Sequence, residues 1–246
     1  MTTNPNQKLI GSAIKRHQIR YDLEIIANLI EAKAKVLDIG CGNGELLKYL
    51  KEVKKIDGRG LEISPSDVSL AVKSGLSIIQ GDAKDDLAYY PNNSFDYAIL
   101  SQTLQAMKDP KEIMEQMLRI AEFAIISLPN FAYFKNRLYL LLKGQMPVSK
   151  TIPYQWFDTP NIHFCSIKDF EKLCKDMDFI IKKKIYLTNK GELAGLMEGK
   201  IFANFFAEYG IFLITKNELA LNAESELTFN KKQELFSLKK AAINPI

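Results

Sequence analysis

The sequence predicts an α/β domain with a doubly wound, mostly parallel sheet of seven strands. Seven short apolar runs are spread along the chain, and most of them alternate with longer segments whose apolar residues recur at helical spacing. Most of the runs are nearly continuously apolar, which is typical of parallel strands covered by helices on both faces. A turn with three glycines directly follows the first run, and such a turn lets a backbone approach a ligand closely.

The length of the chain allows one sizeable core. The 246 residues are enough for a single domain with short appendages, and two full domains are not expected. We expect residues 1–20 to form an N-terminal extension, residues 21–216 to form the domain, and residues 217–246 to form a loosely attached tail. The tail is predicted because its charges are interspersed and its apolar residues follow no clear period.

An amphipathic helix is predicted before the first strand. Within residues 21–30, Leu23, Ile26, Ala27 and Ile30 fall on one helical side. Strand and helix segments then follow one another in the order KVLDIG, ELLKYLKEV, GRGLEI, PSDVSLAVKSG, LSIIQG, FDYAILS, PKEIMEQMLRIAE and FAIISLP. Strands that alternate with helices in this way form parallel sheets, because each helix returns the chain to the same edge.

Helix starts are marked by local sequence signals. Pro65 and Pro110 stand at first helical positions, where the fixed φ of proline helps and its missing N–H costs nothing. Ser166 and Asp169 have the spacing of a capping box, although Asp replaces the usual Glu or Gln. After them, FIIKKKIYL and YGIFLITK predict two more strands, which we expect to form an antiparallel edge pair.

Composition and charge exclude several classes of protein. Hydrophobic residues make up 47% and charged residues 25%, which is ordinary for a globular domain. The longest apolar run considered, residues 138–142, is far shorter than a membrane span, and the first residues lack a secretory signal, so we expect a cytoplasmic protein without a membrane partner. The net charge of +4 is spread along the chain, which makes nucleic acid an unlikely partner. Cys41, Cys165 and Cys174 contain no CxxC pair, which argues against disulfides and structural zinc.

The strongest chemical signal is the segment VLDIGCGNGE, residues 36–45. Asp38 ends a buried strand, and Gly40, Gly42 and Gly44 follow at alternate positions before a helix. A dinucleotide fingerprint would need glycine where Glu45 stands, and a phosphate-binding loop would need a following Gly-Lys-Ser/Thr. The pattern instead resembles the first motif of the class I S-adenosylmethionine-dependent methyltransferases, whose cofactor carries no phosphate.

Acidic residues after the next two strands strengthen this interpretation. Glu62, followed by Ile63, stands where a carboxylate can accept both ribose hydroxyls of a nucleoside. Asp82, followed by Ala83, stands where such enzymes bind the adenine amino group. We expect Ser101 and Gln102, after the fourth strand, to face the methionine part of the cofactor or its substrate. Cys41 is either a nucleophile or, as we favour, a small side chain that fills a crowded turn.

The segment YQWFDTPNIHFC, residues 154–165, joins the only tryptophan, Trp156, to several polar groups. Tyr154, Asp158 and His163 are candidates for a catalytic base, although a histidine just before a helix cap is often structural. Tryptophan and tyrosine also often anchor protein interfaces. Upstream, Phe131, Phe134, Leu138, Leu141 and Leu142 share one side of a predicted helix, with Lys135, Arg137 and Lys143 elsewhere. This helix either covers the sheet as core or stands out as an apolar docking surface with a basic rim.

Several stretches of the sequence resemble the family of the methionine biosynthesis protein MetW. They are VLDIGCGNGELLKYL, GLEISPSDV, SIIQGDAKDDLAYYPNNSFDYAILSQTLQAMKDP, SLPNF and, most specifically, PYQWFDTPNIHFCSIKDFEKLC. The resemblance runs from about Tyr21 to Thr215, with Ser64 standing where an acid is expected. It implies a Rossmann-like, class I methyltransferase-like fold and a role beside MetX-type homoserine O-acyltransferase, as a partner that supports its activity. Residues 131–165 are the expected contact surface for this partner.

Three functions of different classes follow from the sequence. The first is an accessory partner of homoserine acylation that binds S-adenosylmethionine or S-adenosylhomocysteine, with the hypothesis that the cofactor orders the segment from Trp156 to His163 and so reports methionine status. The second is an active small-molecule methyltransferase. The third, suggested only by the basic balance of charge, is a nucleic-acid methyltransferase.

Overall fold

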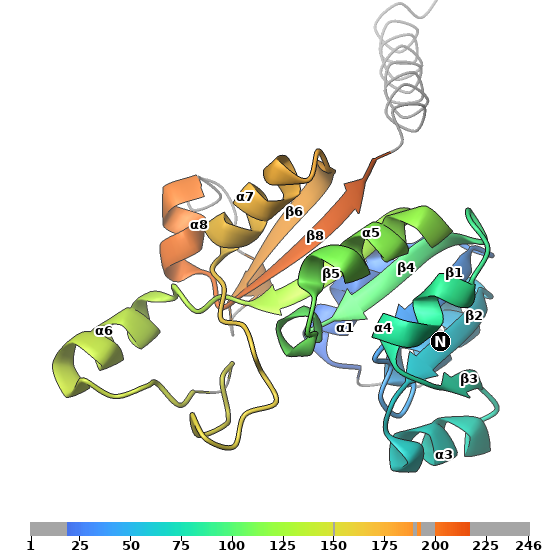
Figure 1. Ribbon diagram of the computed structural model, residues 1–246, viewed down its shortest axis with the longest axis horizontal. Coiled ribbons are helices and arrows are strands. Elements are labelled where there is room, and N and C mark those ends of the chain that lie inside the picture. The colour runs from blue at the N-terminus through green and yellow to red at the C-terminus, as the bar shows by residue number, and fades with distance from the viewer. Residues whose placement is uncertain (1–18, 150, 189–190, 193–199, 217–246) are drawn as a thin grey trace, which may run out of the picture.

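The computed structural model describes residues 19–149, 151–188, 191–192 and 200–216. The predicted N-terminal extension, residues 1–20, lies almost entirely outside these ranges, and the predicted tail, residues 217–246, lies wholly outside them. The described chain forms one sheet in the order β3-β2-β1-β4-β5-β8-β6-β7 (Figure 1). The strands are β1 Lys35–Ile39, β2 Asp57–Glu62, β3 Ser77–Gln80, β4 Phe95–Ser101, β5 Ala121–Pro129, β6 Ile180–Thr188, β7 Gly191–Glu192 and β8 Tyr209–Thr215.

The seven predicted strands are all present, and the doubly wound α/β fold is confirmed. Strands β1 to β5 pair in parallel, with the chain reversing its direction of winding between β1 and β4. The structure adds β7, a two-residue strand paired with β6. The two strands predicted as an antiparallel edge pair are β6 and β8, which pair antiparallel with each other at that end of the sheet. Strand β8 also pairs antiparallel with β5 and so joins this pair to the parallel strands.

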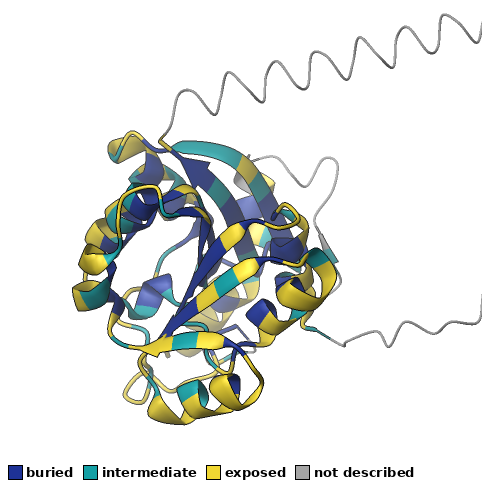
Figure 2. Cartoon of the chain, turned by 90° about the vertical axis from the view of Figure 1, so that its right-hand side faces the viewer, coloured by how far each residue is buried: buried dark blue, intermediate teal, exposed yellow. Residues whose placement is uncertain are grey.

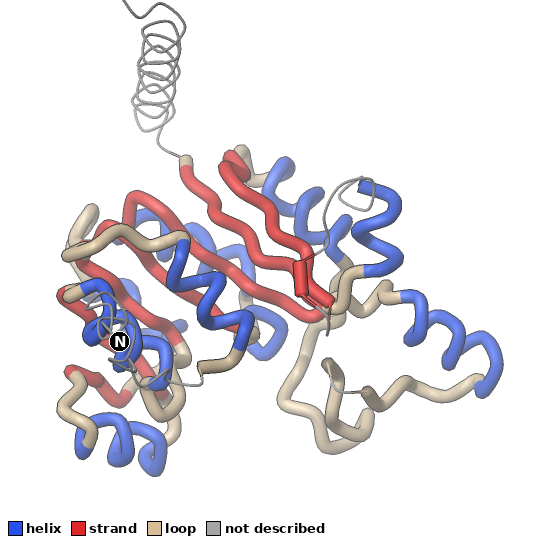
Figure 3. The backbone as a smooth tube through the Cα atoms, turned by 180° about the vertical axis from the view of Figure 1, so that it is seen from behind, coloured by secondary structure: helices blue, strands red, loops and turns tan. Residues whose placement is uncertain are grey.

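Helices cover both faces of the sheet, as Figure 3 shows from behind. They are α1 Tyr21–Asn28, α2 Glu45–Lys54, α3 Pro65–Lys73, α4 Ala83–Asp86, α5 Pro110–Ile120, α6 Phe134–Lys143, α7 Ile167–Asp176 and α8 Lys200–Phe206, with 3-10 turns η2 Leu87–Tyr89 and η3 Leu104–Ala106. One core joins a sheet face to residues of α5, α7 and α8, and a second core joins the other face to residues of α1, α2 and α3.

The predicted helix starts are confirmed by their caps. Ser64 and Asp109 accept hydrogen bonds from backbone N–H groups in the first turns of α3 and α5, and a proline occupies the first position of each helix. In α7 the Ser166 hydroxyl accepts from the Asp169 N–H while the Asp169 carboxylate accepts from the Ser166 N–H. Asp therefore completes this capping box although its side chain is one carbon shorter than that of Glu.

Burial differs strongly between parts of the chain (Figure 2). Strand β3 is largely exposed, against the expectation of burial on both faces, because it lies at the edge of the sheet. Helix α6 differs more: of its ten described residues only Asn136 is buried. It projects away from the sheet (Figures 1 and 3), so the docking alternative for this helix is the one that the structure supports.

Candidate functional site: a cavity at the carboxyl ends of the strands

The turn after β1 requires glycine for two different reasons. Gly40 has a φ of +67°, and an added Cβ would lie 2.8 Å from Cγ2 of Thr103. Gly42 has a φ of +54°, yet an added Cβ would meet nothing within 4 Å. The first glycine therefore lets the turn pack against the chain, while the second borders open space in which a ligand could lie.

Glu62 ties the end of β2 to this glycine turn. Its side chain is buried, and Oε2 accepts a hydrogen bond from the Gly42 N–H at 2.7 Å while Oε1 accepts from the Ser64 N–H at 2.9 Å. Each carboxylate oxygen has two acceptor positions, so each keeps one for a ligand hydroxyl. The two backbone bonds fix the orientation of the carboxylate.

Asp38, in β1, and Cys41, within the turn, are not among the described residues that line the cavity. Burial and, second, the negative charge of Glu62 raise the pKa of Asp38 from 3.8 to about 7. Burial, followed by the charges of Asp38 and Glu62, also raises the pKa of the Cys41 thiol well above its ordinary value. A Cβ added at Gly60 would lie 2.5 Å from the Cys41 sulfur, so this thiol fills a crowded space and stays protonated, as expected for a packing residue.

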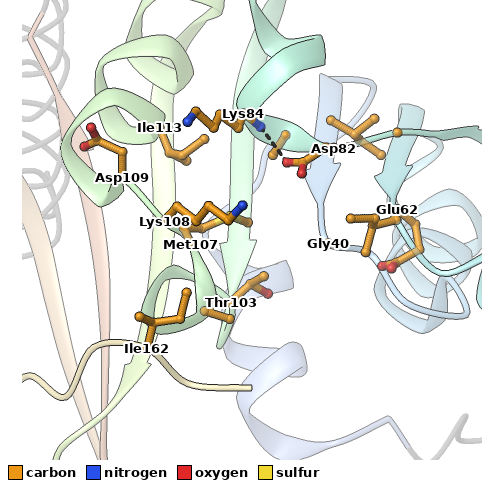
Figure 4. A pocket seen from close by; sticks show the side chains of 15 residues that line it. Gly40, Glu62, Asp82, Lys84, Thr103, Met107, Lys108, Asp109, Ile113 and Ile162 are labelled. Atoms are coloured by element: carbon orange, nitrogen blue, oxygen red, sulfur yellow. Dashed lines mark hydrogen bonds between the residues drawn. The ribbon is translucent and has the colours of Figure 1, made fainter. Parts of the chain in front are cut away.

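A cavity of about 420 Å³ opens beside Glu62 at the carboxyl ends of the parallel strands (Figure 4). This is the place where doubly wound sheets bind their ligands. Of the residues predicted to bind a cofactor, the cavity brings together Gly40, Glu62, Ile63, Asp82 and Ala83. Asp82 is exposed, and its Oδ1 accepts from the Lys84 N–H at 2.9 Å, which leaves Oδ2 available to a ligand.

The opposite wall of the cavity was missed by the sequence analysis. It is formed by Thr103, Ala106, Met107, Lys108, Asp109 and Ile113 from η3 and the start of α5, and by Ile162 from a distant loop. The residues near η3 could have been anticipated, because they follow the carboxyl end of β4. Ile162 could not, since no local pattern indicates that its loop returns to this edge of the sheet.

Ser101 and Gln102 are not among the described residues that line the cavity. The hydroxyls of Ser101 and Ser127 lie 3.2 Å apart, and the Gln102 side-chain amide donates to the Asp22 carboxylate of α1 at 2.8 Å. The Gln102 N–H also donates to the Ser127 hydroxyl at 3.0 Å, and Gln102 has a φ of +54°. In this arrangement both residues anchor the loop after β4, and their predicted contact with a cofactor stays a prediction.

The catalytic candidates Tyr154, Asp158 and His163 are all exposed, and none of them lines the cavity. The His163 backbone N–H donates to the carbonyl of Gln105 at 2.9 Å, so the position of this residue is fixed through its main chain. The structure therefore brings the loop of His163 to the rim of the cavity but does not bring these three side chains into it.

Helix α6 and the described residues of the loop that follows it, residues 134–149 and 151–165, form a projecting arm. The arm exposes many large apolar side chains, including Trp156 at 71% and Leu141 at 80%. The others are Leu138, Tyr139, Leu140, Leu142, Met146, Val148, Tyr154, Phe157, Ile162 and Phe164. Single exposed apolar residues are ordinary, but a gathering of this size usually marks a binding surface.

The root of the arm contains a second, shallower hollow of about 320 Å³. It is lined by Arg137 of α6, Lys168 of α7 and residues of α8, among them Phe202 and Phe205. The Arg137 guanidinium lies over the Phe205 ring at 5.4 Å from its centroid. Of the basic rim predicted for α6, which is Lys135, Arg137 and Lys143, only Arg137 lines this hollow. Neither Arg137 nor Lys168 has an ion-pair partner in the described ranges, although the Arg137 Nε–H donates to the Ala132 carbonyl.

Among the helices that the structure describes, none is long and apolar enough to cross a membrane. All three cysteines lie in the described ranges and are free thiols, in agreement with the prediction.

Comparison with known proteins gives one family and one fold. The family described as "Methionine biosynthesis protein MetW" matches residues 20–214. A Rhodopirellula baltica protein named "Bifunctional methionine biosynthesis protein MetXA/MetW" is 32% identical over 177 residues, which are 68% of this chain but only 28% of that protein. This chain therefore spans less than a third of that relative. A demethylmenaquinone methyltransferase of Shouchella clausii is 24% identical over 55% of this chain and 66% of its own length.

Solved structures confirm the fold at low sequence identity. An S-adenosylmethionine-dependent methyltransferase from Thermotoga maritima superposes with a TM-score of 0.55 and 19% identity over 80% of this chain and 87% of its own. Another from Methanosarcina mazei superposes with a TM-score of 0.56 and 17% identity over 78% of this chain and 96% of its own. The chain thus has the class I methyltransferase-like fold, single-domain and Rossmann-like.

Proposed function

This chain belongs to the family of the methionine biosynthesis protein MetW, and on that basis we propose that it is an accessory partner of a MetX-type homoserine O-acyltransferase. We further propose that its cavity binds S-adenosylmethionine or S-adenosylhomocysteine. The observation that carries the proposal is the combination of a cavity lined by acids from successive strand ends with an exposed apolar arm beside it.

The residues of the cavity fit an adenosine-type cofactor. Glu62 keeps one acceptor position on each oxygen for the two ribose hydroxyls, and Asp82 keeps one oxygen for the adenine amino group. The open space beside Gly42 suits the part of the cofactor that follows the ribose. When bound, the cofactor would supply an activated methyl group on a sulfonium, or, after demethylation, only a nucleoside thioether.

The cavity offers little that methyl transfer to a protonated acceptor would need. Such a transfer uses a base within hydrogen-bond reach of the acceptor. Among the described residues that line the cavity there is no histidine, tyrosine or cysteine, and the candidates Tyr154, Asp158 and His163 do not line it. Besides Glu62 and Asp82, the lining holds Lys84, Lys108 and Asp109, and Asp109 already accepts from the Glu112 N–H as the cap of α5. The accessory role is therefore preferred because of the family and the exposed arm, and not because of the lining of the cavity.

The arm suits a protein partner. Aromatic and aliphatic side chains exposed on one projecting element are the groups that anchor interfaces, and Trp156 is the residue type most often found as an anchor. The hollow at the root adds two basic groups, Arg137 and Lys168, that would complement acidic side chains. The relative that carries the names MetXA and MetW in one chain supports an acyltransferase as this partner, with contacts from residues 131–165.

The proposal is tested by the rate of homoserine O-acylation by the acyltransferase of the same organism, with and without this protein. We expect the rate to rise until the two proteins are present in equal amounts. Trp156→Ala should weaken the complex about 30-fold or more, because an anchor residue carries about 2 kcal/mol or more of binding energy. Tyr89→Ala is the matched control, since Tyr89 is also a largely exposed aromatic residue and lies outside the arm.

Failure of this test has a defined meaning. If the rate does not change at any ratio of the two proteins, the accessory role is wrong. Transfer of label from radioactive S-adenosylmethionine to a small-molecule acceptor, lost in Glu62→Ala, would then establish the second function, an active small-molecule methyltransferase.

A further inference from the structure

One residue belongs to both candidate surfaces. Ile162 lies within the arm, and its side chain also lines the cavity opposite Glu62 and Asp82 (Figure 4). In the chain alone this side chain remains 57% exposed. A ligand that filled the cavity would cover it, and the covered apolar area would hold the loop in place.

The backbone beside Ile162 is held by a single carbonyl. The carbonyl of Gln105, in η3, accepts hydrogen bonds from the Ile162 N–H at 2.8 Å and from the His163 N–H at 2.9 Å. The next two residues after Gln105, Ala106 and Met107, line the cavity. A ligand in the cavity therefore contacts the loop through Ile162 and also contacts the segment to which the loop is bonded.

Gln105 itself is firmly placed. Its side chain is buried, its amide donates to the Gln102 carbonyl at 2.7 Å, and Gln102 is bonded in turn to α1 and β5. The Gln105 Oε1 atom is buried and has no hydrogen-bond partner among the described residues. A buried acceptor without a hydrogen-bond partner destabilises the folded state. A small rearrangement that gave Oε1 a donor would therefore stabilise this segment.

We propose that an adenosine-type ligand in the cavity fixes the arm segment Asn161–Phe164 against Gln105, and that this makes partner binding through the arm dependent on the ligand. This inference rests on the proposed function, since it assumes that the cavity binds such a ligand. The hydrogen bond from the Ile162 N–H to the Gln105 carbonyl is the contact through which a ligand in the cavity would affect the arm.

The sign of the dependence follows from the cost of ordering. An exposed loop that binds a partner loses conformational freedom, and this loss weakens the complex. A ligand that has already fixed the loop removes part of the cost, so the partner binds more tightly to the liganded protein. By thermodynamic reciprocity the partner must then tighten ligand binding by the same factor.

Hydrogen exchange of the isolated protein, followed by mass spectrometry, tests the contact without the partner. S-adenosylhomocysteine is the probe, and its affinity is measured in parallel by calorimetry. At saturation we expect the amides of residues 161–164 to exchange about tenfold more slowly, as local opening becomes rarer. Unchanged exchange with bound ligand would overturn this inference and leave the cofactor site intact; failure of the ligand to bind would overturn both.

Two isoleucines on opposite walls provide a matched pair of variants. Ile162→Ala and Ile63→Ala each remove three carbons from the cavity wall, and each should weaken the ligand about fivefold by lost apolar contact. At saturating ligand, Ile63→Ala should still show slowed exchange of residues 161–164, whereas Ile162→Ala should not. Equal behaviour of the two variants would contradict a specific role of Ile162.

The full complex provides the last measurement. Titration of the acyltransferase into this protein, with and without S-adenosylhomocysteine, should show about tenfold tighter binding with the ligand, and Ile162→Ala should abolish the difference. A complex of normal affinity that ignores the ligand would overturn the inference while preserving the accessory role. Absence of any complex would overturn the accessory role and, with it, ligand-dependent partner binding.

Discussion

The cavity edge and the projecting arm differ in how firmly the rest of the chain holds their side chains. At the cavity edge the functional groups are fixed by strand ends and by backbone hydrogen bonds, as Glu62 is by Gly42 and Ser64. In the arm the large side chains stand out from the chain, and Trp156 and Leu141 pack against little of it. The first region holds its polar groups in fixed positions, whereas the second leaves apolar area exposed in the described part of the chain.

The two regions differ in how much they indicate about what would bind to them. A rigid cavity reports the chemistry of its ligand through the positions of a few polar groups. An uncovered apolar arm suits a partner but does not identify one, and the partner proposed for this chain comes from the family and from the relative that carries both names. The two regions meet at Ile162, which lies in the arm and also lines the cavity.

The largest expected contrast concerns a buried carboxyl group. Asp38 has a pKa raised from 3.8 to about 7, so between these values the folded protein binds a proton that the unfolded chain releases. Stability from this group is therefore fully present below pH 4 and is lost as the pH rises through 7, by at most about 4 kcal/mol. The unfolding free energy of the parent minus that of Asp38→Asn should therefore fall between pH 4 and pH 8, and denaturant unfolding of both proteins at several pH values measures it.

An exposed residue of the arm without a titratable group serves as the control for this prediction. Gln155→Ala should show the same pH dependence of the unfolding free energy as the parent protein, because it removes no titratable group. If the unfolding free energies of the parent and Asp38→Asn depend on pH in the same way, Asp38 is solvated in the folded protein, and the end of β1 is less tightly packed than the structure indicates.

The second contrast compares leucines in two helices. Leu50 in α2 is fully buried in the core, and Leu50→Ala should lower the unfolding free energy by about 3 kcal/mol. Leu141 in α6 is exposed, and Leu141→Ala should change it by less than about 0.5 kcal/mol. Denaturant unfolding measures both. A large loss in Leu141→Ala would mean that the arm packs against the isolated chain and is not a free surface.

The third contrast is a matched pair of glutamates at the glycine turn. Glu62→Gln places an amide group where two backbone N–H donors now meet a carboxylate, so one donor must face another donor. We expect S-adenosylhomocysteine to bind about 30-fold more weakly, which corresponds to about 2 kcal/mol. Glu45→Gln alters an exposed carboxylate in the first turn of α2 and should leave the affinity unchanged; equal losses in both variants would remove Glu62 from the ligand site.

The sequence alone determined the fold and one wall of the site. The periodicity of apolar residues predicted the strands and helices, and capping residues such as Ser166 and Asp169 predicted where helices begin, because both signals act over a few neighbouring residues. The acids after successive strands were predictable for a related reason: parallel strands end at the same edge, so Glu62 and Asp82 had to lie close together. The family itself was also readable from the sequence, most specifically from residues 153–174.

Only the tertiary structure decided what the apolar residues of α6 and its loop do. An amphipathic pattern fixes which side chains share a face, but it does not fix whether that face meets the sheet or the solvent. The structure turns Leu138, Leu141 and Leu142 to the solvent and brings Ile162 to the cavity wall. Both outcomes depend on contacts between residues far apart in the sequence, such as the bonds of Ile162 and His163 to Gln105, and no local pattern encodes them.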